Sequence, residues 1–230
     1  MDSLTKQISL KYGNKELAFN IRAKNLLKIL SPSGCDPIED VPNAVAHALE
    51  KPVGMIPLKD ILRERKPEKP LIIASDHTRV VPGYPVILES LMNEFQEAGI
   101  DPDHISLFIA TGNHRAPSCE EREAMYGSQA FDQMNLYAHN CDHNCISLGK
   151  LSTGHEVEVN QRLLESDFIV ATGKITPHYL AGFSGGRKAI MPGCASRGSI
   201  AANHAMIVRR KNGPGLLNKN PIHLISNFRK

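Results

Sequence analysis

Three apolar runs constrain the fold of this chain more than any other feature. They are LIIAS (71–75), ISLFIA (105–110) and DFIVAT (167–172). Runs of this kind are typical of strands covered on both faces, as in parallel sheets. Between the first two runs, residues 84–98 carry apolar side chains at helical spacing, and Gly99 follows where a C-terminal cap is expected. The order strand, helix, strand predicts a βαβ unit.

Shorter elements are expected on either side of this unit. Residues 8–21 alternate apolar and polar side chains around Gly13-Asn14, which predicts a β-hairpin with a tight turn. Helical spacing recurs within 37–50, with acidic residues in the first turn, and a short helix is expected from near Ser199. Further candidates are strands at 135–138, 145–148 and 156–159 and a helical stretch at 161–166. The fold class is therefore α/β, with a mixed, largely parallel sheet, flanking helices and an N-terminal β-hairpin.

The composition of the chain argues against some classes of binding partner. Basic residues number 27 and acidic residues 24, and the net charge of +3 fits a small anionic ligand better than nucleic acid. No stretch approaches the roughly 20 apolar residues that span a bilayer, and the N-terminus lacks the apolar core of a signal peptide. We expect no nucleic-acid or membrane partner and a cytoplasmic location. Five cysteines without an export signal indicate free thiols.

One histidine- and cysteine-rich loop resembles a metal site at first sight. Cys141 and Cys145 lie beside His139 and His143 in AHNCDHNC. Their spacing matches no established zinc pattern, so a polar loop is the favoured interpretation.

Polar residues follow each of the three apolar runs. Segments 76–79, 111–115 and 173–178 each contain a histidine and at least one basic residue. Ligands bind at the carboxyl ends of strands in parallel α/β sheets. If the three strands are neighbours, these segments should line one crevice.

The third segment leads into a glycine-rich loop, PHYLAGFSGGRKAIMPG (177–193). It is not a Walker P-loop, because Arg187 separates Gly186 from Lys188 and Ala189 replaces the hydroxyl residue. Glycines still allow positive φ angles and a close approach of the backbone to a phosphate or a planar ring. On its own, the loop fits a flexible surface turn equally well.

Four motifs together resemble a known family. SDHTR (75–79), ATGNHR (110–115), GKITPHYLAGFSGGRKAIMPG (173–193) and IAANH (200–204) are similar, in this order, to the N-terminal domain of the nickel-dependent lactate racemase family. The resemblance covers roughly residues 8–222. The four-part pattern is far more specific than any of its parts.

The resemblance implies a racemase or epimerase of a 2-hydroxyacid, lactate or a related acid, in the isomerase class. Its cofactor would be a nickel pincer nucleotide, pyridinium-3-thioamide-5-thiocarboxylic acid mononucleotide, which holds nickel. By position, Lys188 would carry the cofactor through a thioamide, and His204 would bind nickel. His114 and His178 would form the acid/base pair that accompanies hydride transfer.

Elementary chemistry agrees with these implied roles. A racemase serves two mirror-related substrates and needs a base on each side of the carbinol, which two histidines on separate loops can supply. Gly185 and Gly186 would let the backbone pass close to the cofactor. Asp76, Thr78 and Arg79 would hold either the cofactor phosphate or the substrate carboxylate, an anion that arginine binds bidentately.

The chain departs from the family in one respect, because family members carry a C-terminal domain that closes over the site. We expect residues 1–230 to form a single N-terminal catalytic, cofactor-binding domain without that part. Its expected partners are the small 2-hydroxyacid, the cofactor-biosynthesis enzymes and the missing C-terminal domain. Since closure excludes water, the isolated chain is expected to bind cofactor poorly and to turn over little.

Two other functions fit the same residues. One is a zinc-assisted hydrolase that holds its metal directly on His114, His178 and His204 and needs no lysine adduct. The other is a non-catalytic nucleotide- or phosphate-binding module. Such a module would keep its ligand affinity when His114 and His178 are replaced.

Overall fold

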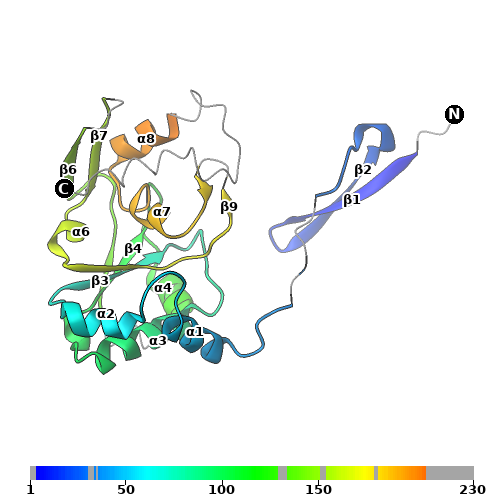
Figure 1. The fold of residues 1–230 in the computed structure, drawn as a ribbon. Helices are drawn as coiled ribbons and strands as arrows, with labels where there is room; N and C mark the ends of the chain where they lie inside the picture. The colour runs from blue at the N-terminus through cyan, green and yellow to red at the C-terminus, as the bar shows by residue number, and fades with distance from the viewer. Residues whose placement is uncertain are drawn as a thin grey trace. The chain divides into compact units, whose positions relative to one another are not determined.

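The computed structural model describes residues 4–30, 34, 36–128, 134–150, 154–178 and 181–205 (Figure 1). The chain divides into two compact units, Met1–Glu39 and Asp40–Lys230. The first holds the N-terminal hairpin and the second holds the α/β fold. That residues 1–230 act as a single domain stays a prediction.

The first unit is the expected β-hairpin. Strands β1 (Thr5–Tyr12) and β2 (Lys15–Arg22) pair antiparallel and are followed by the short 3-10 helix η1 (Ala23–Asn25). Gly13 has φ of 59°, a conformation that tight hairpin turns need and glycine adopts at little cost. The register places Ile8 opposite Phe19, so the apolar side chains gather on one face of the hairpin.

The second unit is built on a four-stranded parallel sheet. Its strand order is β5 (Asn135–Ala138), β4 (Ser106–Ala110), β3 (Pro70–Ser75) and β8 (Phe168–Ala171). The expected strand–helix–strand unit and the α/β class are confirmed. One expectation was wrong: the third apolar run is not covered on both faces. Strand β8 is half-buried and Ala171 is exposed, because β8 lies at the sheet edge and pairs only with β3.

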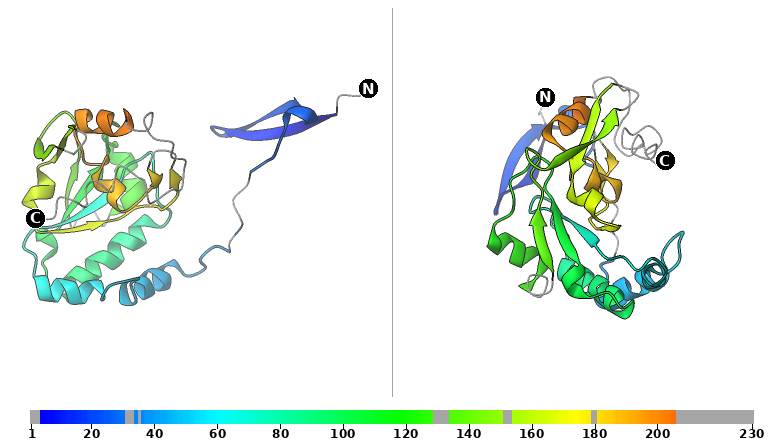
Figure 2. Two further views of the ribbon diagram at one scale, coloured as in Figure 1. Left: turned by 45° about the horizontal axis from the view of Figure 1, so that its top comes forward. Right: turned by 90° about the vertical axis from the view of Figure 1, so that its left-hand side faces the viewer.

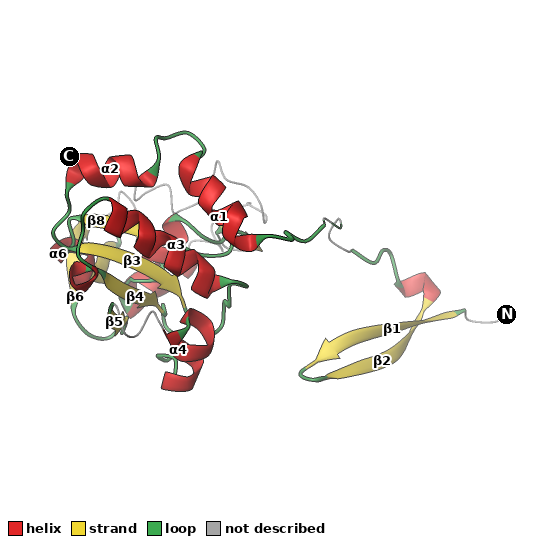
Figure 3. Ribbon diagram, turned by 90° about the horizontal axis from the view of Figure 1, so that it is seen from below, coloured by secondary structure: helices red, strands yellow, loops and turns green. Residues whose placement is uncertain are grey.

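Helices cover one face of this sheet. Helix α3 (Tyr84–Glu97) packs on it, α1 (Val41–Glu50) and α2 (Leu58–Arg65) pack against α3, and α4 (Cys119–Tyr126) completes the layer (Figure 3). The core between α3 and the sheet contains Ile72, Leu107, Leu91 and Phe95, all at most 3% exposed.

The sequence made predictions about the ends of two helices, α3 and α1. Gly99 has φ of 83° and the Ile100 N–H donates to Phe95 O, so the predicted C-terminal cap of α3 is confirmed. Helix α1 has no acidic residue in its first turn. Asp40 lies at the N-cap instead, where its carboxylate accepts a hydrogen bond from the Asn43 N–H at 3.0 Å.

Smaller elements lie on the other face of the sheet. The hairpin β6 (Cys145–Lys150) and β7 (Glu156–Asn160) supports α8 (Arg197–Ala205), which begins two residues before Ser199 (Figure 2). Helices α6 (Arg162–Glu165) and α7 (Arg187–Ile190) pack on the same face. The short strands β9 (Pro177–His178) and β10 (Gly182–Phe183) pair with each other, and η2 (Pro102–His104) contacts α3 instead. The short strands expected at 135–138, 145–148 and 156–159 are thereby confirmed.

The histidine- and cysteine-rich loop is part of this second layer. Cys141 packs with Met191, Ala195 and Ile200, and the His139 Nε2–H donates to Ala195 O at 2.9 Å. The cysteines of the described ranges, Cys119 among them, are free thiols. Across the described ranges, no helix has the length and apolar character needed to cross a membrane.

Candidate functional site

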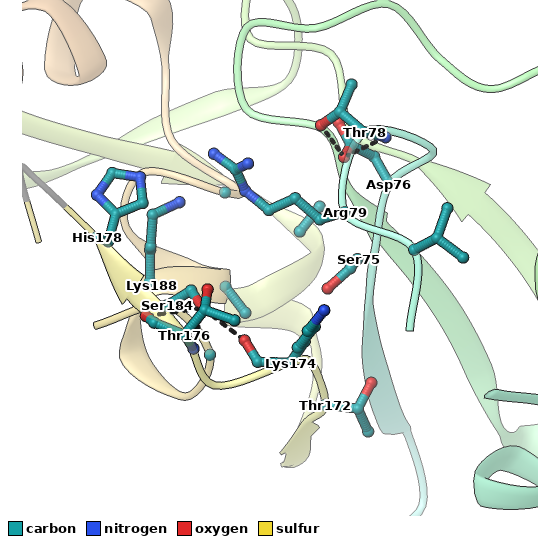
Figure 4. A pocket seen from close by; sticks show the side chains of 15 residues that line it. Ser75, Asp76, Thr78, Arg79, Thr172, Lys174, Thr176, His178, Ser184 and Lys188 are labelled. Carbon is teal, nitrogen blue, oxygen red and sulfur yellow. Dashed lines mark hydrogen bonds between the residues drawn. The ribbon is translucent and has the colours of Figure 1, made fainter. Parts of the chain in front are cut away.

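The loops that follow β4, β3 and β8 meet at the carboxyl-terminal end of the parallel strands. Because these strands are neighbours and parallel, their carboxyl ends lie together, as the sequence predicts. Two adjoining cavities of about 290 and 280 Å³ lie there, and both are lined by Asp76, Arg79, His178 and Lys188. We call them the first and second cavity and together the crevice. Figure 4 shows the side chains of the first cavity.

Asp76 organises the loop after β3. Its carboxylate is 2% exposed, and Oδ1 accepts hydrogen bonds from the Thr78 N–H at 3.1 Å and the Thr78 hydroxyl at 2.7 Å (Figure 4). Its other oxygen, Oδ2, lies 2.6 Å from Nδ1 of His114. The buried carboxylate therefore orients the His114 ring, which projects from the loop after β4 into the second cavity. Asp76 and Thr78 bond to each other and to His114, so Arg79 is the member of the predicted trio best placed to bind an anion.

His178 enters the crevice from the opposite side, on β9. The Ala181 N–H donates to its Nδ1 at 3.2 Å, so the proton of the neutral ring sits on Nε2. Burial lowers the pKa of His178 to about 4, and the nearby charges of Lys188, Arg79 and His204 act in the same direction. The ring is therefore neutral near pH 7.

Lys188 lies in α7, between the two cavities. Gly185 and Gly186 precede this helix with φ of 75° and 50°, and the Lys188 N–H donates to Gly185 O at 3.1 Å. Burial and, to a smaller extent, the Arg79 charge lower the pKa of Lys188 to about 8, although the Asp76 carboxylate opposes the shift. Roughly a tenth of this amine is therefore uncharged and nucleophilic at pH 7, far more than of an ordinary lysine.

His204 reaches the second cavity from α8. Ser196 and Ser199 fix the start of that helix, because the Ser199 N–H donates to Ser196 Oγ at 3.2 Å and the Glu158 N–H donates to Ser199 Oγ at 2.8 Å. Burial lowers the pKa of His204, and the charge of Lys188 adds to the effect. A neutral imidazole is the form that binds a metal ion.

Metal binding by protein side chains alone is not supported in this crevice. Within the described part of the chain, His, Cys, Asp and Glu side chains form no group of three that could hold a metal ion. The zinc site of the hydrolase interpretation needs His114, His178 and His204 as such a group. Among the described residues, these three histidines do not form one.

Three glycines at or beside the crevice differ in what they do. Gly185 lines the first cavity, but Gly186 lines neither cavity and forms the N-cap of α7. Gly193 lines both, and a Cβ at that position would lie 2.3 Å from Ala189 O. Only glycine lets α7 and the following loop pack this closely.

Several lining residues received no role from the sequence. Ser75, Thr172, Lys174 and Ser184 line the first cavity. Their signal was available, because Ser75 is the last residue of β3 and Thr172 and Lys174 come directly after β8. All the predicted site residues except Gly186 line the crevice, and their chemical roles stay predictions.

The chain is similar to known proteins over most of its length. Residues 12–215 match the family model for the lactate racemase N-terminal domain. The chain belongs to this family. The resemblance carried by the four sequence motifs is therefore confirmed.

Individual members of the family are similar over most of this chain. The lactate racemase of Thermoanaerobacterium thermosaccharolyticum is 36% identical over 94% of the chain and 51% of its own length. The lactate racemase of Lactiplantibacillus plantarum is 34% identical over 78% of the chain and 42% of its own length. The chain thus spans about half the length of the curated relatives it matches.

Solved structures agree with this assignment. The lactate racemase apoprotein of T. thermosaccharolyticum matches with a TM-score of 0.77 and 33% identity, over 95% of this chain and 51% of the other. A Thermotoga maritima protein matches with a TM-score of 0.62 over 81% of this chain and 46% of the other. At 22% identity, the second match supports the fold alone.

Proposed function

We propose that this chain is the cofactor-binding half of a 2-hydroxyacid racemase, with lactate or a related acid as substrate. The observation that carries the proposal is the meeting of His114, His178 and Lys188 in one crevice, from three separate segments. The His114 and His178 rings can exchange protons with a substrate, and the Lys188 amine can form a covalent bond. The lactate racemases similar to this chain support the choice of reaction.

The residues of the crevice fit a nickel pincer nucleotide. Lys188 has the partly neutral amine that a covalent attachment requires, and His204 offers one imidazole to a metal ion. When bound, such a nucleotide would accept and return the Cα hydride of the substrate.

The histidines would move the hydroxyl proton of the substrate. His178, neutral near pH 7, can accept a proton, and Asp76 holds the His114 ring by its Nδ1. One ring, neutral at the start, takes the hydroxyl proton as the planar 2-keto acid forms. The other ring, protonated at the start, gives its own proton to the keto oxygen when the hydride returns to the opposite face, so the two rings exchange protonation states in each turnover. Arg79 would bind an anionic group of the substrate or cofactor.

Intact-protein mass tests the proposal directly. The chain is co-expressed with the cofactor-biosynthesis enzymes, supplied with nickel and compared with Lys188→Ala and with Lys150→Ala, an exposed lysine of β6. We expect an increment of cofactor size in the wild type and in Lys150→Ala but not in Lys188→Ala. An increment that survives Lys188→Ala would refute the tether.

Replacing the histidines separates catalysis from binding. In a racemase completed with the second half of a relative, His114→Ala and His178→Ala should each slow racemisation by about 100-fold to 10,000-fold. The mass increment on Lys188 should remain in both variants. Unchanged turnover of lactate enantiomers, followed by chiral chromatography, would favour the non-catalytic binding module.

A further inference from the structure

Lys188 presents an amine to both cavities of the crevice. Its side chain is half-buried and lines both cavities, whereas Lys174 lines only the first. Within the described ranges, the Lys188 amine has no hydrogen-bond acceptor and no ion-pair partner. The carboxylate that lines the same cavities, Asp76, accepts hydrogen bonds from Thr78 and is paired with His114. The protein therefore leaves this amine available to a ligand.

A second cation lies beside this amine. Arg79 also lines both cavities, and Figure 4 shows its guanidinium near the Lys188 amine, where the two charges repel each other. The Arg79 guanidinium likewise has no hydrogen-bond or ion-pair partner in the described part of the chain. A lysine that is partly desolvated beside another cation loses its proton more readily, and its neutral form is a nucleophile. The crevice thus holds a nucleophile next to an anion-binding group.

The backbones that carry these two side chains are fixed. The Lys188 N–H donates to Gly185 O at 3.1 Å, and Lys188 O accepts from the Gly193 N–H at 3.1 Å. The Arg79 N–H donates to Asp76 O at 3.0 Å. Both side chains therefore project from positions that are set before a ligand binds, which reduces the entropy lost on binding.

The pairing of an amine with a guanidinium indicates a class of ligand. A neutral lysine amine forms an imine with the carbonyl carbon of a ketone or aldehyde. A guanidinium binds a carboxylate through two parallel hydrogen bonds. A 2-keto acid carries both groups on adjacent carbons, so a small member of this class can contact Arg79 and Lys188 at once. The cavities, of about 290 and 280 Å³, have room for such a molecule.

We propose that the chain, when it carries no cofactor, captures a 2-keto acid as an imine on Lys188 with the carboxylate on Arg79. The Nζ lone pair attacks the keto carbon, and the amine gives one proton to the keto oxygen as the C–N bond forms. The resulting hydroxyl leaves with the second amine proton as water, and a C=N bond replaces the C–O bond. The step needs neither an oxidant nor a reductant. His178, which lines both cavities, can relay the two protons.

The imine and the proposed tether would use the same nitrogen atom. A captured 2-keto acid would therefore delay the attachment of a cofactor to Lys188, and hydrolysis of the imine would release the amine again. The proposed racemase would form a 2-keto acid in this same crevice. The inference does not rest on that function, because capture needs neither a cofactor nor turnover.

Reductive trapping with pyruvate, a small 2-keto acid, tests the capture. The chain, expressed without the cofactor-biosynthesis enzymes, is incubated at pH 7 with pyruvate and sodium cyanoborohydride, which reduces an imine to a stable secondary amine. Peptide mapping by mass spectrometry should find Lys188 modified at least about tenfold faster than Lys150, an exposed lysine outside both cavities. Lys188→Arg keeps the positive charge but cannot form the imine, so only its other lysines should be modified, at wild-type rates. Trapping of Lys188 no faster than Lys150 would overturn the inference.

Acetone tests the role of the carboxylate. It offers a ketone without the carboxylate, and Lys150 corrects for the different intrinsic reactivity of the two probes. The preference of Lys188 for pyruvate over acetone should exceed that of Lys150 by at least about tenfold, and Arg79→Gln should remove most of this difference. Arg79→Gln should still fold, because the guanidinium has no partner among the described residues. Equal preferences at the two lysines would refute a 2-keto acid as the class of ligand.

Failure of this inference can be distinguished from failure of the racemase proposal. Trapping of pyruvate at Lys188, found together with no cofactor increment on the chain, would sustain the imine and refute the tether. A cofactor increment on Lys188 without trapping of pyruvate would refute the imine alone.

Discussion

The two histidines of the crevice are chemically different. His114 has a buried carboxylate 2.6 Å from Nδ1, whereas His178 lies among the positive charges of Lys188 and Arg79. Asp76 offers a counter-charge to any proton that His114 gains, whereas the charges of Lys188 and Arg79 add to burial in lowering the pKa of His178. A proton that moves between them therefore meets an asymmetric pair, although a racemase must process both enantiomers. We expect the unequal pair to give the two enantiomers different initial rates of racemisation at saturating substrate. The equilibrium between the enantiomers should stay the same.

The amine of Lys188 should be unusually reactive. With a pKa of about 8, about half of it is neutral at pH 8, whereas roughly 0.4% of an ordinary lysine is neutral there. At limiting acetic anhydride, peptide mapping by mass spectrometry should find Lys188 acetylated before exposed lysines such as Lys150. The advantage should shrink as the pH rises toward 10, where roughly a quarter of an ordinary lysine is also neutral. Labelling of Lys188 no faster than Lys150 at pH 8 would contradict the lowered pKa.

A buried histidine outside the crevice, His139, should make the stability of the fold depend on pH. It is 2% exposed, its Nε2–H donates to Ala195 O, and burial lowers its pKa. The unfolded chain, in which a histidine titrates near 6.5, therefore binds the proton more readily than the folded chain does. The stability this group contributes is present above about pH 6.5 and is lost as the pH falls below it, by up to about 1.4 kcal/mol per pH unit.

Urea denaturation at pH 7.5 and pH 5.0 measures this effect. The free energy of unfolding should fall at the lower pH in the wild type. His139→Asn should be less stable at pH 7.5 but should lose less on acidification, because it removes the titrating ring. His143→Asn, at an exposed position of the same loop, should lose as much as the wild type. Equal losses in the wild type and His139→Asn would show that His139 does not carry the pH dependence.

Among the helices and strands, those with a regular apolar pattern could be predicted from the sequence. Which strands pair with each other could not. Strands β3 and β4 and helix α3 follow from apolar runs and helical spacing, because core burial dictates both. The edge position of β8 depends on which strands pair, and a local pattern carries no information about that. Helix α4 escaped prediction, although Ser118 and Glu121 form a capping box whose spacing is visible in the sequence.

The candidate site was likewise predictable from the sequence only in part. The strand-end loops pointed to the crevice, and the family motifs pointed to Lys188 and His204. The anchoring of Ser75 by Tyr84 and Tyr126 could not be predicted, since those contacts join α3, α4 and β3 in space. Predicting them requires the packing of helices on the sheet and not the order of residues.

The turn between α7 and α8 should be intolerant of any side chain. In Gly193→Ala, the new Cβ would lie 2.3 Å from Ala189 O and 3.0 Å from Ala110 Cβ, so the backbone must move. We expect a loss of about 1–3 kcal/mol in the free energy of unfolding by urea denaturation. Gly198→Ala in α8 is the matched control, because its nearest neighbour is 3.9 Å away and alanine favours a helix by about 1 kcal/mol. Equal stability of the two variants would refute the packing argument.

At the scale of the whole molecule, the two units differ in how they bury apolar surface. The described buried hydrophobic residues lie between Leu62 and Ile200, all within the second unit. The hairpin of the first unit leaves Leu10 57% and Leu17 52% exposed. Since apolar burial supplies most of the free energy of folding, the second unit holds the core that stabilises this chain.

Removal of residues 1–39 should therefore leave the α/β unit folded. Its parallel sheet and the helices packed on it use only residues of the second unit, so we expect a cooperative urea transition with a midpoint close to that of the full chain. The separate peptide 1–39 should show little strand signal by circular dichroism, because a two-stranded hairpin is marginally stable in water. Loss of the cooperative transition in the shortened chain would mean that the hairpin contributes to the core. A stably folded peptide would mean that its exposed apolar face is covered by self-association, which sedimentation of the peptide would detect.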